Sequence, residues 1–488
     1  MSMIKDDLFE TTVGLEIHVE LATATKMFCS CEVAFGGDPN TRTCPVCLGM
    51  PGSLPVPNEK AVEYTMKIGL ALGCRIAEHS LFHRKNYFYP DMPKNYQISQ
   101  YDEPLCSGGA VSISGEWGET RVGITRVHLE EDTGKSFHIG GGGRIADSEY
   151  SLEDFNRAGT PLVEIVTEPD IHSAEEARAF VTELRSILEG LGVSDVRMEE
   201  GSLRVDANVS VRRIGETEHG AKVEVKNMNS IRSVARALEY EERRQRDALS
   251  AGESLVQETR HFDEKSGTTS SMRTKEYAFD YRYFPEPDMV PFEPAAEWLE
   301  RVGASLPETP AARRARFAAD YGLGEKDVEV LTATSRVARW FDEAAAAYPG
   351  DAKKVANWII ADLYGLLNEA GIELHESKIA PPQLAAMIEL VDAGTISGKQ
   401  AKTVLGGMFE TGKDADQVVE ERGLKQVSDE GAIESFVDEV IAENGDAADK
   451  VRAGNTGTIG FLVGQVMKKS RGGANPQMVN ELLRRKLT

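Results

Sequence analysis

Residues 13–21 are the stretch of the chain whose residue types and spacing best suit chemistry. Apolar and polar side chains alternate throughout it, and the polar positions include Glu16, His18 and Glu20. Strict alternation is typical of a half-buried β-strand, in which successive side chains point to opposite faces. Two carboxylates and an imidazole in one row can hold a hard cation or transfer protons. A strand with one solvated face would show the same pattern. The other acids of the chain are therefore needed to distinguish a functional site from a solvated face.

Further carboxylates occur in two other predicted strands. Residues 126–132 end in Glu130-Glu131-Asp132, and Glu164 interrupts an otherwise apolar run. A carboxylate on a buried strand is costly unless it is paired, protonated or bound to a metal ion. For Glu164, a buried ion pair, for example with Arg157, is the alternative to a ligand role. Oxygen ligands from separate strands together with His18 fit a magnesium–nucleotide site, because Mg²⁺ keeps water and phosphate oxygens as its other ligands.

The sequence contains no convincing phosphate-binding loop. Gly134-Lys135-Ser136 matches the end of a Walker A motif, but Leu129 stands where the motif requires its first glycine. The acids at 130–132 also have the wrong charge for a loop that cradles phosphate with backbone amides. Any use of ATP is therefore expected to depend on magnesium held by carboxylates.

Four cysteines fall within residues 29–47, as Cys29, Cys31, Cys44 and Cys47. Paired knuckles at this spacing are typical of tetrahedral zinc, and four thiolates leave no position for a catalytic water. Two disulfides are the alternative, but a cytoplasmic chain disfavours them. The sequence therefore predicts a structural Zn²⁺ site.

Composition restricts the remaining possibilities. The chain has 488 residues and a formal net charge of −24, which argues against non-specific binding to nucleic-acid backbone. No apolar run reaches the roughly 18 residues of a membrane span, and the N-terminus lacks the features of a signal peptide, so a cytoplasmic location is expected. Phosphate contact is most plausible near the C-terminus, although the same charges could simply complement helix ends. The basic residues there are Lys468, Lys469, Arg471, Arg484, Arg485 and Lys486.

The pattern of elements predicts an α+β protein. Ser202–Arg212 alternates strictly, residues 222–226 repeat the pattern, and helical segments are expected at about 174–190 and 230–249. After residue 295 the apolar spacing becomes helical throughout. We expect a first domain with a large antiparallel sheet at 1–295, which includes the zinc knuckle. An all-α helical domain should follow at 296–410, and a small helical tail at 411–488.

These residues resemble the GatB family, the B subunits of the aspartyl/glutamyl-tRNA(Asn/Gln) amidotransferases. The resemblance covers nearly the whole chain, and its strings are too long and unusual to arise by chance. They are Val13–Leu21, Arg84–Asp91, Tyr96–Gln100, His128–Asp132, Asn156–Asp170, Met198–Asn208, Asp280–Asp288 and Gly460–Gln465.

The resemblance implies a ligase reaction. ATP phosphorylates the side-chain carboxylate of Glu-tRNA(Gln), Asp-tRNA(Asn) or both, and ammonia then displaces the phosphate to form the amide. The resemblance assigns His18, Glu131 and Glu164 to magnesium. It makes Lys85 and Glu16 the catalytic candidates, and Glu130 and Arg157 the candidates for contact with the nucleotide.

The resemblance makes the domain at 1–295 a catalytic cradle and the tail at 411–488 a tRNA-binding domain. It also implies partners. Ammonia should come from a separate glutaminase subunit, designated A, and a small subunit, designated C, should complete a heterotrimer. Because free ammonia becomes protonated in water, a sealed polar channel is expected. Our candidates for its lining are the mixed-charge faces of residues 204–212 and 222–226.

Two other classes of function compete with this interpretation. A non-enzymatic, zinc-dependent RNA-binding scaffold would explain the cysteines and the basic tail, but it leaves the carboxylates and His18 without a role. A free-standing amide ligase for small molecules would act on free glutamate. Magnesium-dependent ATP turnover that requires glutamyl-tRNA would distinguish the three.

Overall fold

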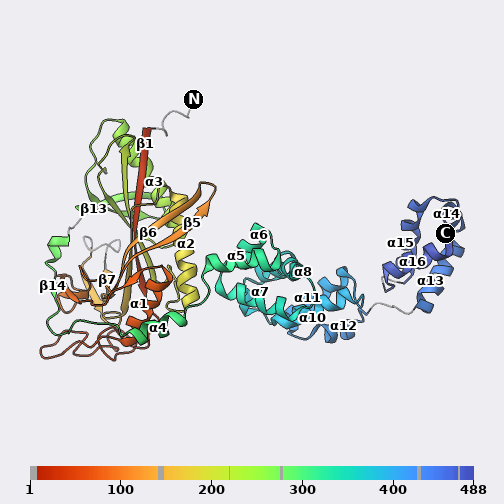
Figure 1. Ribbon diagram of the computed structural model, residues 1–488, viewed down its shortest axis with the longest axis horizontal. Coiled ribbons are helices and arrows are strands. Elements are labelled where there is room, and N and C mark those ends of the chain that lie inside the picture. The colour runs from red at the N-terminus through yellow and green to blue at the C-terminus, as the bar shows by residue number, and fades with distance from the viewer. Residues whose placement is uncertain are drawn as a thin grey trace. The chain divides into compact units, whose positions relative to one another are not determined.

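The computed structural model describes residues 8–140, 148–218, 220–274, 278–425, 430–470 and 473–487. The N-terminal Met1–Asp7, part of the glycine run that follows Gly140, and Arg471 of the basic cluster lie outside these residues. The chain forms two compact units, Met1–Pro310 and Ala311–Thr488 (Figure 1).

A nine-stranded sheet organises the first unit. Its neighbouring strands are antiparallel except for β11 and β12, which run parallel. The exception arises because helix α3 (Ile231–Ser250) connects these two strands, and a crossover helix returns the chain in the same direction. The α+β class with a large, mainly antiparallel sheet is therefore confirmed. In spatial order the strands are β13 (Thr268–Thr274), β12 (Glu258–Asp263), β11 (Val223–Met228), β10 (Leu203–Arg213), β1 (Phe9–Glu20), β9 (Pro161–Thr167), β6 (Gly118–Glu131), β5 (Cys106–Gly115) and β2 (Arg75–Ile76).

The two faces of this sheet differ in chemistry. The odd-numbered residues of β1 from Val13 to Val19 are buried in the main core, which also contains residues of α1 (Glu59–Ala71), α2 (Ala174–Leu191) and α3. The even-numbered residues, including Glu16 and His18, therefore share the opposite, polar face. The sequence sets the limits of α2, since the Ser173 side chain caps its first turn and Gly192 ends it with a left-handed backbone, φ 65°.

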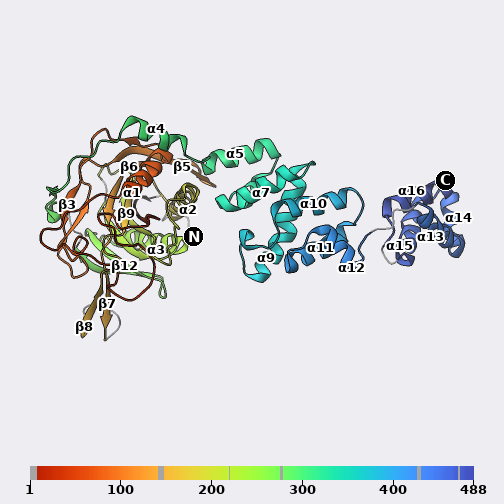
Figure 2. The ribbon, with the colours of Figure 1, turned by 90° about the horizontal axis from the view of Figure 1, so that it is seen from below.

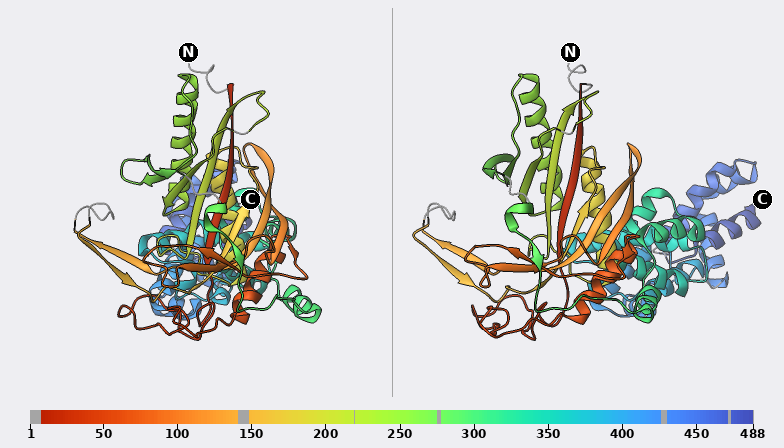
Figure 3. Two further views of the ribbon diagram at one scale, coloured as in Figure 1. Left: turned by 90° about the vertical axis from the view of Figure 1, so that its left-hand side faces the viewer. Right: turned by 60° about the vertical axis from the view of Figure 1, so that its left-hand side comes forward.

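Two smaller sheets accompany the large one. β14 (Phe284–Pro285), β3 (His83–Asn86) and β4 (Tyr96–Ser99) form the first, and the Ile98 backbone N–H on β4 donates a hydrogen bond to the Glu131 carboxylate at the end of β6, 2.9 Å away. β7 (Lys135–Ile139) and β8 (Tyr150–Asp154) form a hairpin that extends away from the body of the first unit (Figures 2 and 3). The last helix of the first unit is α4 (Ala296–Ala304).

The second unit is helical and contains two separate hydrophobic cores. The first core includes Val418 and Val419, which lie beyond the predicted division at residue 411. Within the described ranges, no helix combines the length and apolar composition that crossing a membrane requires. The first core is built from α5 (Pro310–Tyr321), α6 (Glu325–Leu331), α7 (Ser335–Ala347), α8 (Ala352–Trp358), a π-helical turn (Ile359–Leu363), α9 (Tyr364–Ala370), α10 (Pro381–Asp392), α11 (Gly398–Thr411) and α12 (Ala415–Arg422). The second is built from α13 (Glu430–Glu443), α14 (Gly445–Arg452), α15 (Ile459–Lys469) and α16 (Pro476–Leu487).

A buried carboxylate connects α3 to the sheet edge, and its removal should destabilise the first unit. Glu241 is fully buried, accepts hydrogen bonds from Arg244 and Gln245, and accepts one from Thr269 of β13 at 3.0 Å. We expect Glu241→Ala to lower the free energy of unfolding by about 3–5 kcal/mol, because Gln245 and Thr269 lose their buried hydrogen-bond acceptor and Arg244 loses its nearest counter-charge. The exposed Glu239→Ala is the matched control, and denaturant unfolding followed by circular dichroism gives the measurement. Equal stability of the two variants would contradict this role for Glu241.

Candidate functional site

The polar face of the large sheet brings acids and histidines together at its centre. The strand registers align His18 of β1 with Glu164 of β9, and Glu164 with His128 of β6. The His128 ring lies 3.2 Å from the Glu164 carboxylate, and the His18 ring lies 3.9 Å from the same group. Glu130, two residues along β6 from His128, approaches the His18 ring to 3.4 Å. Three adjacent strands thus converge on one small, mostly buried volume.

This cluster has the composition of a cation site. The ligand atoms of His18, Glu130 and Glu164 all lie within 4.8 Å of one another. One imidazole nitrogen and two carboxylate oxygens suit Mg²⁺, which completes its shell with water and phosphate. Burial alone would raise the pKa of the Glu164 carboxyl. The neighbouring His128, His18 and Lys85 have a larger, opposite effect and hold this pKa well below its ordinary value. Glu164 is therefore ionised, as a ligand must be.

Glu131 lies elsewhere, in contrast to the assignment made from the sequence. Its carboxylate contacts the Lys94 ammonium and accepts the Ile98 backbone N–H, while its carbonyl accepts a hydrogen bond from Gln97 at 2.7 Å. The physical reason is the period of the strand: Glu130 and Glu131 are consecutive, so they point to opposite faces. The structure therefore groups His18 and Glu164 with Glu130, and uses Glu131 to attach β4 to β6.

Lys85 lies on β3 beside the cluster. Its ammonium nitrogen is 4.8 Å from the centre of the Tyr281 ring. Burial would lower the pKa of Lys85, but the charges of Glu130 and Glu164 outweigh it and raise the pKa above its ordinary value. A permanently charged ammonium thus faces the carboxylates, a role that nothing in the local sequence indicates.

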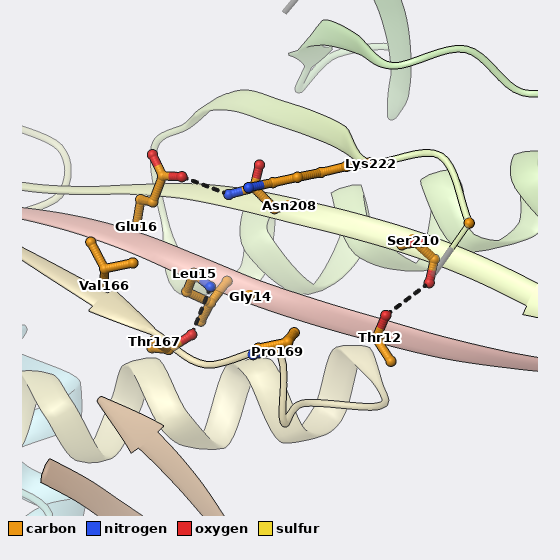
Figure 4. Close-up of a pocket in the computed structure, with 11 residues that line it drawn as sticks. Thr12, Gly14, Leu15, Glu16, Val166, Thr167, Pro169, Asn208, Ser210 and Lys222 are labelled. Carbon is orange, nitrogen blue, oxygen red and sulfur yellow. Dashed lines mark hydrogen bonds between the residues drawn. The ribbon is translucent and has the colours of Figure 1, made fainter. Parts of the chain in front are cut away.

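Glu16 lies one step along β1 from His18, outside the cluster. Its carboxylate accepts a hydrogen bond from the Asn208 amide at 2.8 Å and lines a pocket of about 250 Å³ (Figure 4). Gly14 leaves this part of the polar face without a side chain. Thr12, Ser210 and Lys222 line the pocket together with the apolar Leu15, Val166 and Pro169. The pocket is small, and its walls carry hydroxyl, amide and charged groups next to the cluster.

Arg157 does not pair with Glu164. It donates hydrogen bonds to the carbonyls of Thr133 and Gly134 and lies 3.6 Å from the Asp132 carboxylate, which also binds Arg204 at 2.8 Å. Burial, and then the negative charge of Asp132, raise the pKa of the neighbouring Glu20 to about 8. The two arginines thus form a second charged group at the edge of the cluster.

The four knuckle cysteines form a separate group. All are free thiols, as a metal site requires and a disulfide pair would not allow. Their sulfur atoms lie within 4.8 Å of one another. A hydrogen bond with Cys29 lowers the pKa of the Cys47 thiol to about 5, and Lys26 acts in the same direction. The set therefore fits a closed tetrahedral metal site of the Zn²⁺ type.

Lys26 joins this knuckle to the rest of the domain. The side chain is fully buried, and its ammonium lies 3.8 Å from the Cys47 sulfur and donates to the Phe155 carbonyl at 3.1 Å. The Met27 backbone N–H donates to the Gly159 carbonyl, and the Gly159 N–H donates to the carbonyl of Asp132. Gly159 has φ +86°, and a Cβ there would lie against Lys26, Cys47 and Glu131. The knuckle and the charged end of β6 are thus in direct contact through one short loop.

Sequence reasoning missed His128 and Lys26. His128 could have been found, because it is two residues from Glu130 on an alternating strand and therefore shares its face. Lys26 gave no such signal, since its burial depends on contacts with Phe155.

Comparisons with known proteins assign the chain to a class. Residues 11–300 match the model of the GatB/GatE catalytic domain, and residues 339–487 match the model of the GatB domain. The fold and the polar cluster therefore belong to an amidotransferase-type catalytic domain followed by helical domains.

Full-length relatives define the family. The B subunit of the aspartyl/glutamyl-tRNA(Asn/Gln) amidotransferase of Carboxydothermus hydrogenoformans is 54% identical over 98% of this chain and 99% of its own length. The protein of the same name from Moorella thermoacetica is 54% identical over 98% of this chain and all of its own, and that from Persephonella marina is 51% identical over 97% and 98%. The chain belongs to the GatB family, the B subunits of the aspartyl/glutamyl-tRNA(Asn/Gln) amidotransferases. A catalytic domain does not support the alternative of a non-enzymatic scaffold.

Proposed function

We propose that the chain uses ATP to activate the side-chain carboxylate of Glu-tRNA(Gln), Asp-tRNA(Asn) or both, as the B subunit of a glutamine-dependent amidotransferase. The observation that carries the proposal is the buried group of His18, Glu130 and Glu164 beside Lys85, within a domain of this family. Such a group can hold Mg²⁺ and receive the charge of a nucleotide. Because its substrate belongs to translation, the enzyme acts in the cytoplasm.

The reaction has two steps. A side-chain carboxylate oxygen attacks the terminal phosphorus of ATP, and ADP leaves to give an acyl phosphate. Ammonia attacks the carbonyl carbon, phosphate departs, and the nitrogen loses a proton to give the amide. Magnesium, when bound, would neutralise negative charge on the phosphoryl oxygens. Lys85 orients and stabilises the anionic groups, and Glu16, held by Asn208, is our candidate for the group that accepts the proton.

Magnesium is held, in this proposal, by His18, Glu130 and Glu164, with Glu130 in place of Glu131. Arg157 and Arg204 at the edge of the cluster are candidates for contact with the nucleotide. Ammonia comes from the glutaminase subunit, and the small third subunit of the complex completes a heterotrimer. The polar faces of 204–212 and 222–226 are our candidates for the ammonia route. The Lys226–Asp206 pair at 2.6 Å and the pocket beside Glu16 support this choice.

Substitution of the cluster acids tests the function. We expect Glu130→Gln and Glu164→Gln to lower ATP-dependent amidation of Glu-tRNA(Gln) by more than about 100-fold, because even residues that only support metal ligands typically cost 10–100-fold. Glutaminase turnover of the assembled complex should persist, since that chemistry takes place on a different chain.

Glu131→Gln is the matched comparison. It should act mainly by lowering thermal stability, because Glu131 joins β4 to β6. If Glu130→Gln amidates at the wild-type rate, Glu130 is not a metal ligand and the proposed set of three magnesium ligands is wrong.

In this proposal, zinc occupies the knuckle. Four thiolates carry more negative charge than one Zn²⁺ neutralises, and the buried Lys26 ammonium supplies a counter-charge at the Cys47 sulfur. The role is structural, because no ligand position remains for substrate.

Metal analysis should find one zinc per chain. We expect Cys44→Ser to lose zinc and melt at a lower temperature, since zinc binding contributes directly to folding. Cys74→Ser is the control: it also alters a buried thiol but should retain the metal. Purified protein without zinc, with all four thiols reactive, would show that the knuckle is not a zinc site.

The three hydrophobic cores support a division into a catalytic cradle domain, a helical domain and a tail that binds tRNA. Two of the basic tail residues are neutralised within the tail. Lys469 pairs with Glu439 and Glu443, and Lys486 pairs with Glu434 and Asp438. Lys468, Arg484 and Arg485 are exposed, and their exposure makes them our candidates for contact with phosphate.

Removal of the tail should weaken tRNA binding without unfolding the rest. The cut belongs after residue 425, because α12 packs in the preceding core. We expect the truncated protein to keep its melting temperature and its zinc, and to show a shallower salt dependence of tRNA affinity, by about 0.9 per lost phosphate contact. Filter binding at several salt concentrations gives the measurement. A truncated protein that melts normally and binds tRNA as tightly as the full chain would refute the role.

A further inference from the structure

Three tyrosines form a continuous aromatic group on the small sheet beside the cluster. The Tyr101 and Tyr283 rings stack with centroids 4.5 Å apart and an interplanar angle of 11°. Tyr281 meets Tyr283 edge-on at 6.2 Å, and His83 meets Tyr101 in the same manner. We call Tyr101, Tyr283 and Tyr281 the tyrosine ladder. Their sequence separation means that only the folded chain brings them together.

The ladder adjoins the candidate catalytic residues. Tyr281 lies under the Lys85 ammonium, 4.8 Å away. Tyr101 follows β4, where Ser99 contacts the Glu130 carboxylate at 3.5 Å. Burial, and then the charges of Glu130 and Glu164, raise the pKa of Tyr283, as expected for a phenol that faces these acids. The ladder therefore lies beside the cluster, and we call Tyr281 its inner end and Tyr101 its outer end.

The backbone of this segment is strained and tightly held. Arg282, between two ladder tyrosines, has φ +47°, a left-handed conformation that is rare for a residue with a long side chain. The Asn86 amide donates to the carbonyls of Tyr281 and Arg282 at 2.9 and 3.0 Å. On the other side, Arg84 forms two parallel hydrogen bonds to the buried Glu286, at 2.6 and 2.8 Å. Strain maintained by such contacts is a feature of sites that position a ligand.

The outer end of the ladder is open. Tyr101 is 45% exposed although its ring is fixed by Tyr283 and His83. A rigid, accessible ring in a stack binds flat π systems, and every nucleobase provides one. The basic and metal-ligating residues at the inner end suit the phosphates that accompany a base.

We propose that the tyrosine ladder is a nucleobase-stacking site, with Tyr101 as the residue on which the base stacks. The inference rests on the proposed nucleotide chemistry of the adjacent cluster and adds the binding of the base to it. The base could belong to ATP or to the 3′-terminal adenosine of the tRNA, and both sources present the same chemistry.

Equilibrium binding by the full-length chain tests the site with Tyr101→Leu and Tyr101→Phe. Stacking of one base on an aromatic side chain contributes about 1–3 kcal/mol, so Tyr101→Leu should weaken binding about 5- to 160-fold, whereas Tyr101→Phe keeps the ring and should match the wild type. Tyr150→Leu, at an exposed tyrosine of β8, is the matched control and should change nothing.

The probes separate the two sources. If the base belongs to ATP, Tyr101→Leu loses affinity for Mg-ATP but binds inorganic tripolyphosphate as the wild type does. If it belongs to tRNA, the variant loses affinity for intact tRNA but not for tRNA that lacks its terminal adenosine. Either result supports the site. Unchanged affinity for both ligands, in a variant that melts normally, overturns it.

A second variant keeps the test decisive if Tyr101→Leu folds poorly. Tyr101→Trp should show fluorescence quenching by the stacked base beyond that of the wild-type tryptophans, and absence of any added quenching by ATP and by tRNA overturns the proposal. Failure of the wild-type chain to bind either ligand would instead count against the proposed function itself.

Discussion

The pairing of β1 with β9 is the constraint on which the rest of the site depends. It aligns His18 with Glu164, and the pairing of β9 with β6 extends the row to His128. A shift of one residue in this register would turn the apolar residues Ile17 and Val19 toward the polar face and move His18 into the core. The burial of those apolar residues in the main core therefore stabilises the fold and also determines which acids meet.

A balance of buried charge follows from that register. Glu130 and Glu164 lie against two histidines and Lys85, and Asp132 lies between Arg157 and Arg204. Each of these charges would be costly alone, because transfer from water to the protein interior is compensated only by partners. The polar face of the sheet is thus dense in charge, and most of its buried charges have a partner of opposite sign.

Local patterns predicted much of this architecture from the sequence. The alternation at 13–21 identified β1 and its polar face, the cysteine spacing identified the knuckle, and the helical spacing after residue 295 matched the helical second unit. The patterns could not reveal which partners meet across the fold. The choice between Glu130 and Glu131 depends on the face of β6, and the stack of Tyr101 on Tyr283 joins segments about 180 residues apart in the sequence. The ion pairs of Lys469 and Lys486 likewise depend on how α13 packs in the tail.

Because Lys26 is fully buried between the knuckle and the rest of the first unit, these two parts cannot be replaced independently of each other. Its ammonium is compensated by the cysteine group and the Phe155 carbonyl. A chimera that replaced only residues 29–47 with a cysteine-free loop would remove the thiols from this ammonium and leave the Phe155 carbonyl as its remaining hydrogen-bond acceptor. The neighbouring Gly159 has φ +86°, which disfavours residues with a side chain, so a new partner for Lys26 is not readily placed there. Protein engineering, and evolutionary loss of the metal, must therefore change position 26 together with the cysteines.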